Sequence, residues 1–120
     1  EDRYRVLAEE SLVQIQPLLK QYPLAFGQWL IALDDALSTT TETAIIGAPD
    51  HEGTQALLKA LPSGYHPHRL IAVGVGPRPG LLQERPQIDG KATAYLCRGS
   101  TCRPPVTDAG ALKALLKQTD

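Results

Sequence analysis

The sequence predicts an α/β fold in which an N-terminal helical hairpin packs on a small, mostly parallel three-stranded sheet with flanking helices. Apolar residues recur every three or four positions through residues 1–40, as they do in amphipathic helices. Short apolar runs bounded by turn residues follow at 43–47, 69–74 and 92–97, and each is typical of a buried strand. A helical pattern over 52–61 separates the first two runs, which indicates a β-α-β arrangement.

The first 40 residues form the predicted hairpin. Pro17 should kink the first helix or end it early, because proline removes a backbone donor. The first helix should end by Tyr22 at the latest, since a residue that precedes proline avoids the helical region of φ and ψ. Pro23 then begins a second helix, and two helices joined this tightly run antiparallel. The first helix carries the apolar stripe Ala8, Leu12, Ile15, Leu19 and Tyr22.

The second helix is apolar over much of its circumference, which usually means burial on several sides. Its apolar residues are Leu24, Ala25, Phe26, Trp29, Leu30, Ile31, Ala32, Leu33, Ala36 and Leu37. Since two helices alone cannot bury this surface, we expect the remainder of a longer chain to cover it, or an isolated chain to self-associate through it. The residues expected at this contact are Phe26, Trp29, Leu30 and Leu33.

The second predicted unit opens with the β-α-β segment. Asp50 is a good N-cap for the helix that follows the strand at 43–47. The strand at 69–74 then lies parallel to the first through a right-handed crossover. A loop rich in Gly and Pro spans residues 75–80.

Asp89-Gly90 is a turn signal before the third strand at 92–97. An alternative to the mostly parallel sheet is that this strand pairs antiparallel with residues 86–88 through that turn. Thr107 or Asp108 caps a last helix. Its buried face is expected to carry Leu112, Leu115 and Leu116.

Composition sets the domain boundary and excludes several classes of protein. Acidic residues outnumber basic ones over 1–40, and the balance reverses over 41–120, so we divide the chain there.

A net charge of −1 leaves no basic excess for phosphates, so no nucleic-acid partner is expected. No apolar run approaches the roughly 20 residues of a membrane span, so no membrane partner is expected. The lack of Met and of a signal-peptide pattern predicts a piece of a longer protein, for which we expect a cytoplasmic location.

Cys97 and Cys102 are the first candidate site. Their C-x4-C spacing allows a disulfide if the loop folds back, since the two α carbons must come within roughly 7 Å. A redox pair would need one thiol with a lowered pKa, and Arg98 or Arg103 would help electrostatically. Two free thiols, a static disulfide and metal ligation are the other interpretations.

Two histidines offer a weaker metal hypothesis. His66 and His68 would complete a tetrahedral zinc site with the two sulfurs, but the spacing between the pairs is unusual. A surface turn is the preferred interpretation, and no metal and no other cofactor is predicted.

The ends of the first two strands form a candidate ligand turn at Gly47, Asp50, Gly74 and Gly76. Anions and nucleotides bind where a strand leads into a helix N-terminus. The pattern is no Gly-x-Gly-x-x-Gly, however, and the carboxylate of Asp50 opposes phosphate. A plain capped turn is the alternative.

No catalytic residue is predicted. Asp34 and Asp35 are adjacent, so on a helix they point about 100° apart and make a poor acid/base pair. Whether the parent protein is an enzyme is left open.

Three blocks of sequence resemble the C-terminal end of the thioredoxin-domain-containing, spermatogenesis-associated protein 20-like family. The resemblance covers roughly the whole chain, and the third block is its most specific part. The blocks are Tyr22-Pro23-Leu24-Ala25-Phe26-Gly27-Gln28 with Ala32-Leu33-Asp34, then Ala44-Ile45-Ile46-Gly47-Ala48-Pro49-Asp50, and finally Asp89-Gly90-Lys91-Ala92-Thr93-Ala94-Tyr95-Leu96-Cys97 continuing to Cys102-Arg103-Pro104-Pro105-Val106-Thr107-Asp108.

The resemblance implies a parent several times longer. Its parts would be a thioredoxin-like domain, a toroid of helical hairpins similar to that of glycosidases and N-acylglucosamine 2-epimerases, and a small terminal α/β region. Residues 1–40 would be the last helices of the toroid. On this basis we expect a non-catalytic structural or accessory module. The alternatives are a redox role for Cys97 and Cys102, and binding of a small anion or nucleotide at the strand ends.

Overall fold

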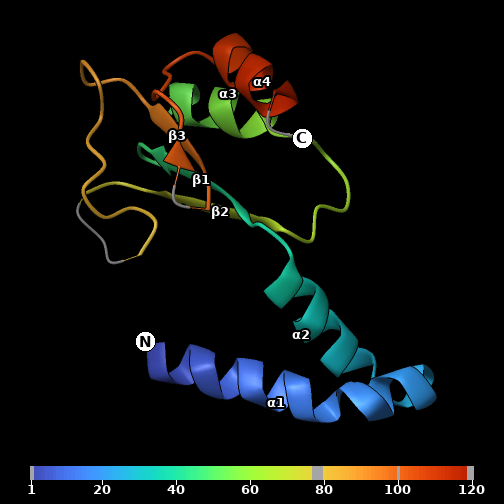
Figure 1. Cartoon of the computed structure of the whole chain (residues 1–120). Coiled ribbons are helices and arrows are strands. Elements are labelled where there is room, and N and C mark those ends of the chain that lie inside the picture. The colour runs from blue at the N-terminus through green and yellow to red at the C-terminus, as the bar shows by residue number, and fades with distance from the viewer. Residues whose placement is uncertain (1, 77–79, 100, 119–120) are drawn as a thin grey trace. The chain divides into compact units, whose positions relative to one another are not determined.

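The computed structural model describes residues 2–76, 80–99 and 101–118, and it divides the chain into the units Glu1–Thr39 and Thr40–Asp120 (Figure 1). We call the first the hairpin unit and the second the α/β unit. Residues 77–79 of the predicted Gly- and Pro-rich loop lie outside the described residues.

The hairpin unit contains α1 (Asp2–Gln21), a 3-10 turn η1 (Pro23–Ala25) and α2 (Gly27–Leu37). Pro17 does not end the first helix, which continues to Gln21. Pro23 opens the 3-10 turn and not the second helix directly, because Phe26 has a non-helical φ of −119° and separates the two. Leu12 and Leu19 of the predicted apolar stripe are the buried residues of α1.

The α/β unit contains six elements within its described part. They are β1 (Thr41–Ile46), α3 (Glu52–Ala60), β2 (Arg69–Gly74), β3 (Thr93–Arg98), β4 (Thr101–Cys102) and α4 (Ala109–Lys117). The predicted class, α/β, is confirmed, and β2 has the predicted bounds.

The prediction of a mostly parallel three-stranded sheet is wrong. Among the described residues the sheet has four strands in the order β2-β1-β3-β4. β1 and β2 are parallel, as the β-α-β pattern predicts, whereas β3 is antiparallel to β1 and β4 is antiparallel to β3. The described part of the β2–β3 connection holds no helix that could carry β3 back to the start of the sheet.

The Asp89–Gly90 turn forms as predicted, but the alternative strand pairing does not extend beyond it. Both residues have a positive φ, 50° and 67°, as a two-residue type I′ turn requires. Ile88 and Lys91 form an isolated antiparallel bridge, so residues 86–88 make no strand. The turn therefore stabilises the residues that precede β3, but it contributes no further strand to the sheet.

The two faces of the sheet are covered differently. α3 and α4 lie side by side over one face (Figure 1), where the main core packs. Its most deeply buried large residues are Ile45, Leu57, Leu96 and Leu112. On the other face Ala44 and Ile46 of β1 pack with Leu82, which belongs to the segment between β2 and β3. That face holds the smaller cluster, and because side chains alternate along a strand, Cys97 lies on the same face of β3 as Tyr95.

The helix caps differ in part from expectation. The predicted N-cap Asp108 is confirmed, because its carboxylate accepts a hydrogen bond from the Ala111 amide at 2.8 Å. α3 is capped by His51 and not by Asp50, since His51 Nδ1 accepts from the Gly53 amide at 3.1 Å. The cap thus lies one residue later than predicted, and a neutral imidazole nitrogen accepts the bond in place of a carboxylate.

Two equally buried threonines test how much an unpaired hydroxyl destabilises the core. Thr43 Oγ1 has no hydrogen-bond partner among the described residues, whereas Thr93 Oγ1 accepts from the Ile88 amide and donates to the Lys91 carbonyl, both at 2.9 Å. Thr43→Val should therefore raise the free energy of unfolding of the α/β unit by about 1–2 kcal/mol, because it removes an unpaired buried hydroxyl. Thr93→Val, the matched control, should lower it by about 1–3 kcal/mol. Urea unfolding measures both, and changes of equal sign would contradict this account.

Candidate functional site

The structure joins Cys97 and Cys102 in a disulfide. The two residues lie directly opposite each other on β3 and β4, with their α carbons 3.9 Å apart. They differ in exposure, because Cys97 is only 2% exposed while Cys102 lies on the surface. Of the interpretations that the spacing left open, the structure thus contains a disulfide and neither two free thiols nor sulfur ligands for a metal.

Arg85 lies against the buried sulfur. Its Nη2 donates toward Cys97 Sγ at 3.5 Å, and its Nη1 donates to the carbonyl oxygen of Leu81. The guanidinium carbon lies 5.9 Å from the centre of the Tyr95 ring, and the Tyr95 hydroxyl donates to the Pro86 carbonyl at 2.6 Å. These contacts hold a half-buried cation beside the disulfide.

The sequence pointed to two other arginines for this electrostatic role. Arg98 and Arg103 neighbour the cysteines in sequence, but both are exposed, and it is Arg85 that donates toward a sulfur atom. Arg85 precedes Cys97 by 12 residues and belongs to a segment without helical or strand periodicity. No local signal could have identified it, because its position depends on how that segment crosses the sheet.

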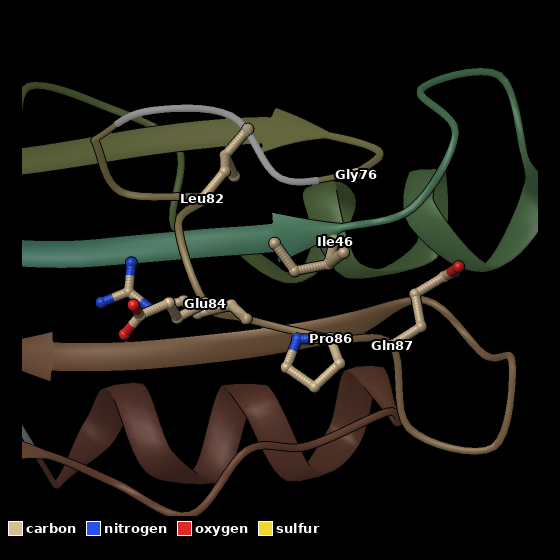
Figure 2. A pocket seen from close by; sticks show the side chains of 7 residues that line it. Ile46, Gly76, Leu82, Glu84, Pro86 and Gln87 are labelled. Atoms are coloured by element: carbon tan, nitrogen blue, oxygen red, sulfur yellow. The ribbon is translucent and has the colours of Figure 1, made fainter.

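A pocket of about 420 Å³ shares Arg85 with this site (Figure 2). Figure 2 shows side chains from the end of β1 and from the segment between β2 and β3 around it. Its lining residues among those described are Ile46, Gly76, Leu82, Glu84, Arg85, Pro86 and Gln87. The pocket is therefore apolar at Ile46 and Leu82 and polar at Glu84, Arg85 and Gln87.

Only one residue of the predicted ligand turn, Gly76, lines that pocket. Gly47 and Gly74 are buried and bonded to each other, the Gly47 amide donating to the Gly74 carbonyl at 2.9 Å. Asp50 is exposed, and the N-terminus of α3 is already capped by His51. The Gly47 amide and the Gly53 amide at the start of α3 are thus engaged within the protein.

The two histidines do not approach the sulfur atoms in any metal-like cluster. The described residues hold no group of three or more His, Cys, Asp or Glu side chains placed to share a metal ion. His66 is exposed and His68 is partly buried in the turn before β2.

The hairpin unit exposes Trp29 and Leu30 of the contact predicted for the second helix, whereas Phe26 and Leu33 are half-buried. None of the eleven residues of α2, all of which the structure describes, is buried. Ile31 is 64% and Leu37 79% exposed, and Trp29 and Leu30 are each more than a third exposed. A groove of about 730 Å³ runs between α1 and α2 and includes Trp29 and Asp35. Asp34 and Asp35 are both exposed, and Asp35 lines this groove.

Three curated proteins align with most of this chain. Rattus norvegicus spermatogenesis-associated protein 20 is 28% identical over 107 residues, which is 83% of this chain. The Homo sapiens protein of that name is 28% identical over 105 residues, and the Mus musculus protein 27% over 107. The chain is similar to spermatogenesis-associated protein 20. This confirms the resemblance predicted from the three sequence blocks.

The alignment covers a small part of spermatogenesis-associated protein 20. The chain spans 13–14% of the length of these relatives. No protein-family model matches the chain, and no solved structure matches it either. In the described ranges no helix combines the length and the apolar character needed to cross a membrane.

Proposed function

We propose that this chain is a non-catalytic accessory module at the C-terminal end of a longer protein similar to spermatogenesis-associated protein 20. Its helical hairpin would dock on the remainder of that protein through the apolar face of α2. The single observation that carries the proposal is that α2 is largely apolar and yet contributes no buried residue to this chain.

The energetics favour a covered α2. Burying one large apolar side chain stabilises a protein by about 1.5–3 kcal/mol. Four such side chains of α2, Trp29, Leu30, Ile31 and Leu37, are exposed here. The only charged residues of the helix are Asp34 and Asp35, so docking would desolvate few ionised groups.

The proposed occupant of this face is helical. Leu30, Leu33 and Leu37 recur at spacings of three and four, which forms a ridge that fits the groove of a neighbouring helix. The relatives are roughly six times as long as this chain, which leaves ample chain to supply that helix. The family resemblance further suggests its source, a toroid of helical hairpins that follows a thioredoxin-like domain in a cytoplasmic protein.

The docking proposal is tested by adding this chain to a parent protein that lacks the corresponding residues. We expect the two to form a complex, and we expect Leu30→Lys combined with Ile31→Lys to weaken it at least tenfold, because two charges would enter an apolar contact. Titration calorimetry measures the dissociation constant. Leu70→Lys, which changes an exposed leucine of β2, is the matched control and should leave the affinity unchanged.

The same variants distinguish docking from self-association. Alone, the chain should dimerise weakly through α2, and the double lysine variant should be monomeric in sedimentation equilibrium. Should the parent protein fail to bind this chain, or bind the double variant as well as the original, the proposed accessory role would be refuted.

A further inference from the structure

We infer that the Cys97–Cys102 disulfide is redox-active and exchanges with dithiols, with Cys102 as the sulfur that is attacked and Cys97 as the leaving thiolate beside Arg85. This goes beyond the accessory role and does not depend on it. The inference rests on three observations of the α/β unit: the unequal exposure of the two cysteines, the cation at the buried sulfur, and the short two-residue pairing of β4 at the sheet edge.

Access decides which sulfur is attacked. An incoming thiolate must approach an S–S bond from the outside, in line with it, so the attacked sulfur has to face solvent. Cys102 lies on the surface, whereas Cys97 is buried on the sheet face that the segment between β2 and β3 covers. Attack on Cys102 is therefore the open route.

Arg85 favours Cys97 as the leaving group. Exchange is faster when the departing sulfur is better stabilised as a thiolate, and a neighbouring guanidinium provides that stabilisation. Arg85 is held at 3.5 Å from Cys97 Sγ by its bond to Leu81 and its contact with the Tyr95 ring. The cation is thus in place before the S–S bond breaks.

β4 can adjust when the disulfide opens. It consists of two residues at the edge of the sheet and pairs with β3 at Cys97–Cys102 and Arg98–Thr101. Directly after it, the Arg103 amide donates to the Leu96 carbonyl at 2.8 Å and so anchors the chain on the far side of Cys102. Such short edge pairing is inexpensive to rearrange. The core on the other side of β3, around Leu96, does not depend on β4.

The reaction balances with two thiol groups as the reductant. The first thiolate attacks Cys102 Sγ, a mixed disulfide forms, and Cys97 leaves as a thiolate. The second thiol of the reductant, as its thiolate, attacks the reductant's own sulfur in that mixed disulfide and releases Cys102 as a thiolate. The two protons of the reductant thiols end on Cys97 and Cys102. The protein disulfide is reduced to a dithiol, and the reductant is oxidised to a disulfide.

The first test is the redox equilibrium of the full chain. The chain is equilibrated in buffers with different ratios of reduced to oxidised glutathione. Free thiols are then blocked by alkylation, and mass spectrometry measures the fraction of the chain that is reduced. A redox-active pair should be substantially reduced in buffers that leave a structural disulfide of a secreted protein oxidised. A pair that stays fully oxidised alongside that reference would overturn the inference.

Arg85 is tested in the same buffers. Arg85→Gln should lower the equilibrium constant for reduction about tenfold, which is about 30 mV for a two-electron couple. Arg85→Lys should restore most of the loss because it keeps the charge, and Arg103→Gln, an exposed arginine next to Cys102, should change the constant less than twofold. Equal effects of Arg85→Gln and Arg103→Gln would contradict the proposed role of Arg85.

Single-cysteine variants identify the attacked sulfur. Cys97→Ser leaves Cys102, which should form a mixed disulfide with oxidised glutathione at least ten times faster than the buried Cys97 does in Cys102→Ser. The opposite order would overturn the assignment. Repeating the reduction with thioredoxin, a protein dithiol, shows which source of thiols is used: faster reduction than by glutathione at equal thiol concentration indicates a protein partner, and slower reduction a small thiol.

Discussion

Replacing Leu57 by alanine is expected to lower the free energy of unfolding of the α/β unit by about 2–5 kcal/mol. Leu57 is 1% exposed and lies on α3, where it packs against the core that the sheet and α4 share. The substitution removes buried apolar surface and leaves a cavity that a helix anchored between neighbours cannot close. Domains of this size are stable by only about 5–15 kcal/mol, so the loss is a large part of the whole.

Urea unfolding followed by circular dichroism, with amide exchange of β1 to report the α/β unit separately, measures this effect. Leu70→Thr is the matched control, because Leu70 is half exposed on the edge strand β2 and threonine is a good strand former. Its effect should stay below about 1 kcal/mol. Equal losses at the two positions would show that the core does not lie between α3, α4 and the sheet.

Replacing Gly47 by alanine should destabilise the α/β unit by about 1–3 kcal/mol. A Cβ at this position would overlap Thr54 Oγ1 and would come within 3.2 Å of Ala92 Cβ. Thr54 is fully buried in α3, so its hydroxyl cannot move aside into solvent. The glycine is required by this close approach of the strand end to the helix and not by an unusual φ.

A double-mutant cycle tests the cause. Thr54→Ala removes the overlapping atom, so the cost of Gly47→Ala should fall by at least half in its presence. Gly27→Ala is the control, because no atom lies within 4 Å of its Cβ position and alanine favours the helix. It should leave stability unchanged or raise it slightly. Additive effects of the Gly47 and Thr54 substitutions would refute the steric explanation.

Local signals predicted most of the elements of this protein. The apolar run at 69–74 coincides with β2, and the runs at 43–47 and 92–97 lie within two residues of β1 and β3 at each end. These signals succeed because burial and capping act over a few neighbouring residues, as at Asp108.

Local signals failed where pairing was long-range. The apolar run of β3 has the same pattern whether it lies parallel or antiparallel to β1, so periodicity could not choose between the two. β4 has two residues, too few to show any period. Its place in the sheet follows from the return of the chain after β3 and from the disulfide.

By itself the sequence determined the order of the four helices and the first three strands, the resemblance to spermatogenesis-associated protein 20, the largely apolar second helix and the candidate cysteine pair. The tertiary structure alone decided that the third strand runs antiparallel, that His51 caps α3, and that Arg85 lies beside Cys97. The physical reason is the range of the interactions. Periodicity and caps depend on residues three or four apart, whereas the cation and the sulfur meet only after an irregular segment has packed across one face of the sheet.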